Sequence, residues 1–155
     1  MYMSNKSEKP RNPIPTVTII IKDNLESNNI LLIRRAREPF KDHLSLPGGF
    51  VNYGERVEDA VKREAEEELT VKVEPIDILG VYSDPRRDPR GHIMSVTFVA
   101  RITEGSNIKA KDDAADYEWV DSSGIENIHL AFDHRQMLSD YRTYQSKGGT
   151  FWSSK

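Results

Sequence analysis

The chain has 155 residues, of which 37% are hydrophobic and 30% are charged, and this is enough for one folded domain with its own core. Its 22 basic and 25 acidic residues give a formal net charge of -3, and this near balance argues against a broad nucleic-acid-binding surface. The chain has no cysteine, which excludes disulfides, a thiol nucleophile and a zinc site built on cysteine.

The first 15 residues, MYMSNKSEKPRNPIP, contain three prolines and many small polar side chains. They leave little to bury, so we expect a flexible N-terminal tail over residues 1–15, followed by a single domain over residues 16–155. This segment lacks the apolar stretch of a signal peptide, and apolar runs such as ILLI are too short to span a bilayer. We therefore expect a cytoplasmic protein with no membrane partner.

The first half of the domain alternates extended segments with turns. The β-branched run TVTIII at residues 16–21 predicts a buried strand, and ILLI at 30–33 predicts a second strand after the turn KDNLESNN. Residues 37–50 (REPFKDHLSLPGGF) predict a loop, because prolines and a Gly-Gly pair interrupt them. A helix is predicted over residues 55–69, and an extended segment over 71–82.

The second half continues the mixture of strands and helices. The charged loop SDPRRDPRG precedes a strand predicted over residues 93–102, and a short strand is predicted over 117–120. A second helix is predicted over residues 132–145, ending near Gly148 and Gly149. Interleaved strands and helices indicate the α/β or α+β class.

The first predicted helix carries an unusual concentration of carboxylates. On a wheel of roughly 100° per residue, one face collects the apolar side chains of Val57, Ala60, Val61, Ala65 and Leu69. Glu64 and Glu68 fall inside this stripe and Glu67 lies at its border, so the three carboxylates share one patch. Acidic runs usually face water, which is one interpretation. The other is that carboxylates turned toward packed surface require a cation, and their oxygen atoms suit Mg²⁺ or Mn²⁺.

This helix and the loop before it resemble the Nudix hydrolase family. The family motif is a Gly, five residues, a Glu, seven residues and then Arg-Glu-U-x-Glu-Glu-x-Gly-U, where U is aliphatic. The chain matches it with Gly49, Glu55 and the run REAEEELTV at residues 63–71. Thr70 replaces the final Gly, which commonly lets the chain leave the helix in a left-handed turn, so we expect a strained or altered helix end. Over residues 15–147 the resemblance implies the Nudix fold, an α/β/α sandwich with a mixed β-sheet.

The resemblance also implies roles for individual residues. The expected metal ligands are Glu64, Glu67, Glu68 and the carbonyl oxygen of Gly49. Arg63 and Glu55 are expected to form an ion pair that holds the loop against the helix, and a weak surface pair is the alternative. In such enzymes Mg²⁺ or Mn²⁺ neutralises a diphosphate and activates water.

Three further segments resemble the ADP-ribose pyrophosphatases of this family, namely residues 38–51, 82–98 and 131–138. The implied reaction converts ADP-ribose and water into AMP and ribose 5-phosphate. In the charged loop, Arg86, Arg87 and Arg90 suit phosphate or ribose-phosphate oxygens, and Asp84 and Asp88 suit ribose hydroxyls. The alternative is a self-paired charged turn, with each aspartate neutralising an arginine.

The general base is not specified by the motif. The acidic segment KAKDDAADYEWV supplies Asp113, which is our candidate, and Glu64 is a second candidate. A hydrated turn is the alternative for Asp113.

Two other functions remain open at this point. One is a Nudix hydrolase for a nucleoside triphosphate or a dinucleoside polyphosphate. The other is a non-catalytic sensor, because some proteins with similar Nudix domains are transcriptional regulators that bind ADP-ribose; their motifs are usually degraded, whereas the carboxylates here are intact. The resemblance also suggests a homodimer.

Overall fold

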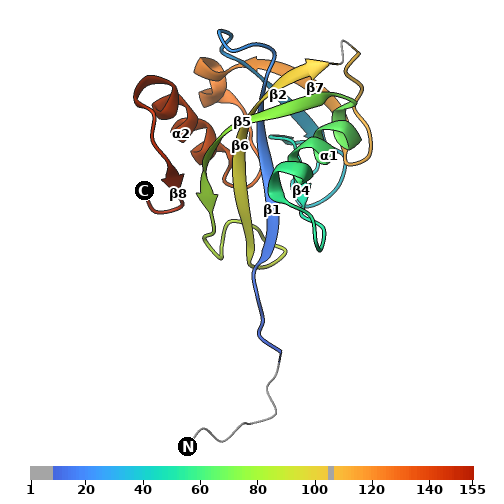
Figure 1. Cartoon of the computed structure of the whole chain (residues 1–155), viewed down its shortest axis with the longest axis vertical. Coiled ribbons are helices and arrows are strands. Elements are labelled where there is room, and N and C mark those ends of the chain that lie inside the picture. Colours follow the sequence, from blue (N-terminus) through green and yellow to red (C-terminus); the bar gives the residue numbers. More distant parts are fainter. Residues whose placement is uncertain (1–8, 105–106) are drawn as a thin grey trace, which may run out of the picture.

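A computed structural model describes residues 9–104 and 107–155 of the chain. These residues form one mixed sheet flanked by two α-helices and a short 3-10 helix (Figure 1). The strands are β1 (Ile14–Lys22), β2 (Asn29–Arg35), β3 (Leu44–Ser45), β4 (Gly48–Phe50), β5 (Lys72–Tyr82), β6 (Ile93–Glu104), β7 (Ala114–Asp121) and β8 (Phe151–Trp152). The helices are α1 (Val57–Leu69), η1 (Ser122–Asn127) and α2 (His134–Lys147).

Strand β1 lies in the middle of the sheet. It pairs in parallel with β6 along its whole length and antiparallel with β2 and β4. β5 extends the sheet beyond β6, and β8 pairs in parallel with β5 at the edge. The sheet therefore contains parallel and antiparallel pairs, which confirms the predicted mixed sheet.

Each face of the sheet has its own hydrophobic core. Val17, Ile19 and Ile21 of β1 point to the face covered by α1. Ile20 points to the opposite face, where it packs in one cluster with Met137 and Leu138 of α2. A strand buried on both faces has a nearly continuous apolar sequence, which explains the run TVTIII and confirms the α/β/α arrangement.

The boundaries of several elements differ from the predicted ones. Residues 1–8 of the predicted tail lie outside the described residues, but Ile14 and Pro15 belong to β1 and pair with Ile93 and Met94, so the tail prediction was wrong for these two residues. The predicted loop over residues 37–50 contains β3 and β4, because tertiary pairing with β2 and β1 gives these short segments their hydrogen bonds.

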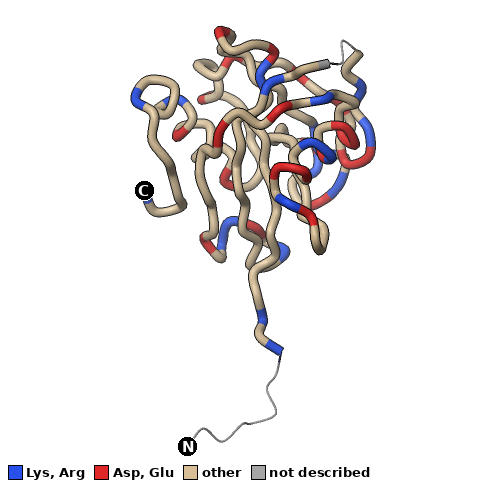
Figure 2. The backbone as a smooth tube through the Cα atoms, in the orientation of Figure 1, with Lys and Arg blue, Asp and Glu red and all other residues tan. Residues whose placement is uncertain are grey.

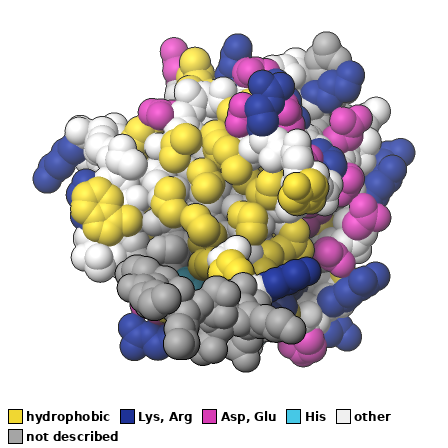
Figure 3. Space-filling model, turned by 60° about the horizontal axis from the view of Figure 1, so that its bottom comes forward, with side chains coloured by type: hydrophobic (Ala, Val, Ile, Leu, Met, Phe, Trp, Pro, Cys, Tyr) yellow, Lys and Arg dark blue, Asp and Glu magenta, His cyan; other side chains and the backbone are white. Residues whose placement is uncertain are grey.

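Within the described part of the chain, no helix is long and apolar enough to cross a membrane. One face of the molecule nevertheless gathers hydrophobic side chains at its centre (Figure 3). Helix α1 covers only one side of the sheet face seen in Figure 1, and it leaves much of β5 and β6 uncovered. Exposed apolar residues on the neighbouring strands include Ile14, Ile78 and Trp152.

Candidate active site

The site is built on helix α1 and strand β4. Helix α1 buries Ala60, Val61, Ala65 and Leu69 against the sheet, as its apolar stripe predicts. Glu64 and Glu68 are buried on the same face. The interpretation that these two carboxylates face packed surface is therefore confirmed, whereas Glu66 and Glu67 are exposed.

The Gly48-Gly49 pair brings the backbone of β4 close to these carboxylates. The backbone N–H of Gly48 donates a hydrogen bond of 3.2 Å to Oε2 of Glu68. A Cβ atom on Gly49 would lie 2.2 Å from Oε1 of Glu64, so a larger residue would displace this carboxylate. Only glycine leaves room here for the backbone and the carboxylate together.

Burial makes the negative charges of Glu64 and Glu68 costly. The pKa of Glu68 is raised to about 8, first by loss of solvation and then by the charge of Glu64, although the Gly48 hydrogen bond opposes this rise. Burial also raises the pKa of Glu64, and the Arg63 guanidinium opposes that shift. Two buried carboxylates close to one another create a strong demand for positive charge.

Arg63 supplies part of this charge. Its guanidinium donates to both oxygens of Glu55 at 2.7 and 2.9 Å, which is the predicted ion pair in bidentate form. The same group donates to Oε1 of Glu64 at 2.8 Å, to Oε2 of Glu67 at 3.1 Å and to the carbonyl oxygen of Phe50 at 2.8 Å. These contacts raise the pKa of Arg63 and join helix α1 to β4 and the following turn. Figure 2 shows the charges of both signs that crowd this part of the molecule.

The predicted metal ligands are only partly brought together. Glu67 binds Arg63 on the exposed side of the helix, whereas Glu68 faces Gly48. Among residues 9–104 and 107–155, no group of three or more His, Cys, Asp or Glu side chains is arranged to hold a metal ion. The donor chemistry does fit a hard divalent cation, because Glu64 and Glu68 offer buried carboxylate oxygens whose mutual repulsion a cation would relieve.

A pocket of about 320 Å³ opens beside Glu64 and Glu68. Strand β1 contributes Thr16 and Thr18 to its wall, and Gly48 and Gly49 lie nearby. The charged residues that line it are Arg35, Arg63, Glu64, Glu68, Arg87, Asp88, Arg90 and Asp113. The pocket therefore combines carboxylates on one wall with several guanidinium groups.

The charged loop after β5 contributes unequally to this pocket. Arg87 and Arg90 line it, together with Asp88, but Asp84 does not reach it and instead binds Arg86 on the surface. The predicted self-pairing is therefore present for Asp84, and Asp88 likewise accepts two hydrogen bonds from the Arg90 guanidinium.

Arg87 is held by a partner that the sequence did not indicate. Its guanidinium donates to both oxygens of Asp133, at 2.8 and 2.7 Å, and to the carbonyl oxygen of Ile93 at 3.3 Å. Its side chain is 5% exposed. With these contacts Arg87 fixes the loop against the start of α2, and it presents little free surface to a ligand.

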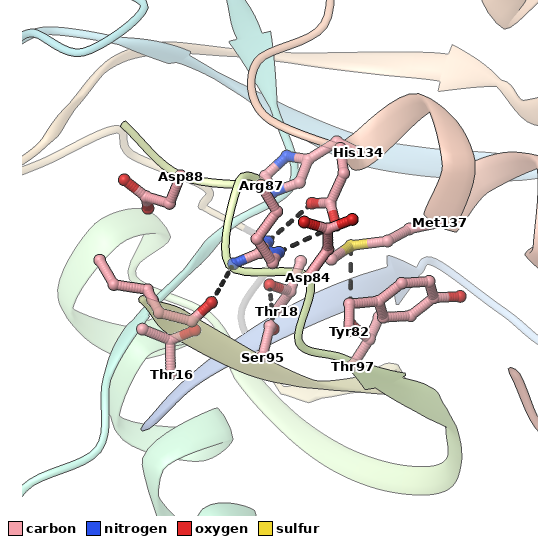
Figure 4. Close-up of polar contacts among 12 residues, drawn as sticks. Thr16, Thr18, Tyr82, Asp84, Arg87, Asp88, Ser95, Thr97, His134 and Met137 are labelled. Carbon is pink, nitrogen blue, oxygen red and sulfur yellow. Dashed lines mark hydrogen bonds and ion pairs between the residues drawn. The ribbon is translucent and has the colours of Figure 1, made fainter. Parts of the chain in front are cut away.

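His134 lies next to Arg87, above Thr16 and Thr18 of β1 (Figure 4). Its Nδ1 accepts a hydrogen bond of 3.0 Å from the backbone N–H of Leu46. Burial, followed by the charges of Arg87 and Arg35, lowers its pKa to about 3. His134 is therefore neutral at physiological pH, with its proton on Nε2, and it ties α2 to the strand segment before Gly48.

Phe50, Phe132 and Arg35 belong to the site, but the sequence motifs did not predict them as site residues. The Arg35 guanidinium lies 4.8 Å from the ring centroid of Phe132, and the Arg90 guanidinium lies 5.3 Å from Phe50 and 5.4 Å from Phe132. Of the Arg35 side-chain nitrogens, only Nε hydrogen bonds within the described residues, to Pro39. The sequence did offer one signal for Arg35 as a site residue, because it lies at the end of a strand, just before a loop.

Asp113 also reaches the pocket. It is exposed, and Nε of Arg37 lies 3.6 Å from its Oδ1. Its charge acts on Glu68, whose pKa it raises. Asp113 thus faces the buried carboxylates from the segment before β7.

The NUDIX domain model matches residues 12–141. The chain therefore belongs to the Nudix family, as the motif in α1 predicts. A protein of Methanocaldococcus jannaschii named ADP-ribose pyrophosphatase is 45% identical over 128 residues, which are 83% of this chain and 72% of the relative. A protein of Acinetobacter baylyi named ADPR responsive transcriptional repressor NtrR is 29% identical over 86% of this chain and 54% of its own length.

Solved structures show the same fold. A MutT/nudix family protein from Enterococcus faecalis superimposes with a TM-score of 0.74 and 31% identity, over 92% of this chain and 66% of that one. A bifunctional NMN adenylyltransferase/ADP ribose pyrophosphatase from Francisella tularensis, complexed with AMP and a Mn ion, gives a TM-score of 0.72 and 25% identity. The match covers 92% of this chain and 44% of the Francisella protein.

Proposed function

We propose that this Nudix hydrolase cleaves the diphosphate of ADP-ribose with the help of a divalent metal ion, giving AMP and ribose 5-phosphate. The observation that carries the proposal is the shared pocket of the buried Glu64 and Glu68 and the guanidinium groups of Arg35, Arg87 and Arg90. A diphosphate needs positive charge around its oxygens, and a metal needs carboxylates beside it. The similarity to the Methanocaldococcus ADP-ribose pyrophosphatase supports this choice of substrate.

Glu64 and Glu68 are the residues that would hold Mg²⁺ or Mn²⁺, together with Glu67 and the carbonyl oxygen of Gly49. When bound, such an ion neutralises phosphate charge and lowers the pKa of a water molecule. Arg63 positions Glu64 through its hydrogen bond of 2.8 Å, and Glu55 holds Arg63 in place. Glu55 and Arg63 thus act through the carboxylates and do not themselves need to touch substrate.

The guanidinium groups divide into two kinds. Arg35 and Arg90 lie against aromatic rings in the pocket, and Arg35 keeps both Nη atoms free of hydrogen bonds to the described residues. We assign Arg35 and Arg90 to the diphosphate. Arg87 supports the wall through Asp133, and Asp88 orients Arg90, so both contribute by positioning.

Asp113 remains our candidate for the general base, with Glu64 as the second candidate. Asp113 is exposed to solvent and lines the same pocket as the buried carboxylates. A base in this position could receive a proton from water and release it to solvent. Glu64 is buried and already hydrogen bonded to Arg63, so it has less access to solvent for releasing a proton.

The test is a substrate panel with purified protein and Mg²⁺ or Mn²⁺. ADP-ribose is compared with 8-oxo-dGTP, dGTP, NADH and a diadenosine polyphosphate, and products are separated by chromatography. We expect metal-dependent release of AMP and ribose 5-phosphate from ADP-ribose at the highest kcat/KM. Faster cleavage of another compound would show that this compound, and not ADP-ribose, is the preferred substrate. Tight ADP-ribose binding without cleavage would indicate a sensor.

We also propose that the protein is a cytoplasmic homodimer that uses the hydrophobic patch of Figure 3 as its interface. The exposed apolar residues on β1, β5 and β8 support this arrangement, since a C2 interface needs one patch that complements itself. The absence of cysteine suits a reducing compartment. The net charge of -3 gives no support for a nucleic-acid partner.

A further inference from the structure

A second cavity lies far from the pocket beside Glu64 and Glu68. It has a volume of about 710 Å³ and lies between the end of α2, the turn after β1 and strand β5. Figure 1 shows these segments on the side of the sheet that carries α2. Lys22 in this cavity is six residues along β1 from Thr16 of the catalytic pocket, which corresponds to about 20 Å in a strand.

Lys22 brings a buried positive charge to the cavity. It is 7% exposed, and its ammonium group donates a hydrogen bond of 3.0 Å to the carbonyl oxygen of Leu25. Within the described residues no carboxylate oxygen lies within 4.0 Å of it. An ammonium group that has no carboxylate beside it can pair with an anion from solution, so this position is suited to receive one.

Tyr141 adds a second group without a partner. Its side chain is 1% exposed, and its hydroxyl is buried without a hydrogen bond to any described residue. Its ring stacks on Tyr144 with the centroids 6.2 Å apart, and the Tyr144 hydroxyl donates to Asp77 at 2.8 Å. The other oxygen of Asp77 accepts from the backbone N–H of Ile78, so the carboxylate that lines the cavity is already hydrogen bonded. The Tyr141 hydroxyl is therefore a polar group of the cavity lining that has no partner within the described residues.

The mouth of the cavity is apolar. Leu25 is 62% exposed and Ile76 is 43% exposed, and both line the opening. Gly148 and Gly149, both with positive φ, form another part of the wall without bulky side chains. The cavity therefore combines exposed apolar side chains with one ammonium group.

From these four observations we propose that this cavity is a second binding site, for a small organic anion with an aromatic or alkyl body. Its carboxylate or phosphate group lies at Lys22 and accepts a hydrogen bond from Tyr141. Its apolar body lies between Leu25 and Ile76. Such a site is separate from the catalytic pocket and does not depend on the proposed hydrolysis.

The test is a titration of the ¹⁵N-labelled full chain, followed by NMR, with phenyl phosphate, benzoate and the neutral benzyl alcohol. We expect saturable shifts of the backbone amides of Leu25, Gly148 and Gly149 with the anions, and at least tenfold weaker binding of benzyl alcohol. The anion that binds more tightly shows whether the site prefers a phosphate or a carboxylate group. Equal binding of benzyl alcohol, or shifts confined to Gly48 and Gly49 of the catalytic pocket, would overturn the proposal.

Two variants locate the bound group. Lys22→Met should weaken anion binding at least tenfold, because it removes the ammonium group that pairs with the anion. Tyr141→Phe, which removes one hydroxyl and keeps the ring, should weaken binding several-fold. Lys41→Met, which changes an exposed lysine outside the cavity, is the matched control and should bind as the wild type does. Unchanged affinity in both cavity variants would overturn the assignment, and all three should hydrolyse ADP-ribose normally.

Discussion

Glu68 combines a negative charge with deep burial, and its pKa of about 8 reflects that conflict. The Glu68→Gln variant keeps the shape of the side chain but loses the charge. We expect kcat for ADP-ribose to fall by about 10³-fold, because the metal loses a ligand. Added Mg²⁺ or Mn²⁺ should raise the Tm of the wild type but not of the variant. Near-normal turnover in Glu68→Gln would exclude Glu68 as a metal ligand, and a matched Glu66→Gln change on the exposed face of the helix is the control.

Arg35 is the guanidinium in the pocket with the most unused hydrogen-bonding capacity. Arg35→Ala should raise KM for ADP-ribose by about 10- to 100-fold, since a charge-assisted hydrogen bond contributes roughly 1.5–3 kcal/mol. Arg35→Lys should restore part of this loss, because lysine keeps the charge but not the planar fork. Steady-state kinetics with both variants provide the measurement, and an unchanged KM in Arg35→Ala would remove Arg35 from the binding site.

Residues of the site could be predicted from sequence where they share one local element. Glu64 and Glu68 follow from helical spacing, and Arg63 and Glu55 follow from the resemblance to the Nudix motif. Asp133 and Phe132 come from a distant segment and meet the loop of Arg87 only after α2 docks, so no local pattern indicates them. The position of Asp84 outside the pocket likewise depends on how a loop turns, which spacing does not determine.

Among the elements, helix α1 ends in a way that its sequence disfavours. Thr70 adopts a left-handed conformation, with φ 59 and ψ 33, and its backbone N–H caps the carbonyl oxygen atoms of Ala65 and Glu66. This conformation is costly for a β-branched residue. Thr70→Gly should therefore increase the free energy of unfolding by about 1 kcal/mol, after allowing for the greater entropy of glycine in the unfolded chain.

Chemical denaturation of the wild type and Thr70→Gly measures this difference. Thr70→Ala is the control, because alanine keeps a Cβ atom in the left-handed region and should gain little. A decrease in stability with glycine would show that the weak hydrogen bond of 3.4 Å from the Thr70 hydroxyl to Lys109 matters more than backbone strain.

The contact between the segment after β3 and helix α2 should make the free energy of unfolding depend on pH, through His134. Its folded pKa of about 3 lies below the usual value of 6.5, so the unfolded chain binds a proton more readily. The stabilisation from neutral His134 is complete above pH 6.5 and is lost as the pH falls toward 3. His134→Asn keeps an acceptor for the Leu46 N–H and does not titrate, so its unfolding free energy should depend less on pH between 6.5 and 4. Identical pH profiles of the two proteins would contradict this role.

Long elements were predictable because their own side chains determine them. The apolar stripe of α1 and the β-branched run of β1 each contain enough periodic signal. Strands β3, β4 and β8 have two or three residues each, and they exist only because a neighbouring strand supplies hydrogen bonds. Pairing of this kind is a property of the assembled sheet and is absent from the local sequence.

At the scale of the whole molecule, the uncovered sheet face predicts self-association. Ile78 lies on β5 and is 42% exposed. Ile78→Lys should convert a dimer into a monomer, because it places a charge within an apolar interface. Light scattering after size-exclusion chromatography measures the mass, and Leu25→Lys, outside this face in the turn after β1, is the control. A wild-type protein of 17.7 kDa at micromolar concentration would exclude the proposed dimer.

The central position of β1 also affects the order of folding. Its parallel partner β6 lies far along the chain, and the hydrogen bond between Thr18 and Ser95 joins residues 77 positions apart. A pair of such high contact order forms slowly, because a long loop must close first. During synthesis, the apolar run of β1 leaves the ribosome well before β6 exists. The nascent chain must therefore keep its most hydrophobic segment from aggregating until more than half of the protein has been made.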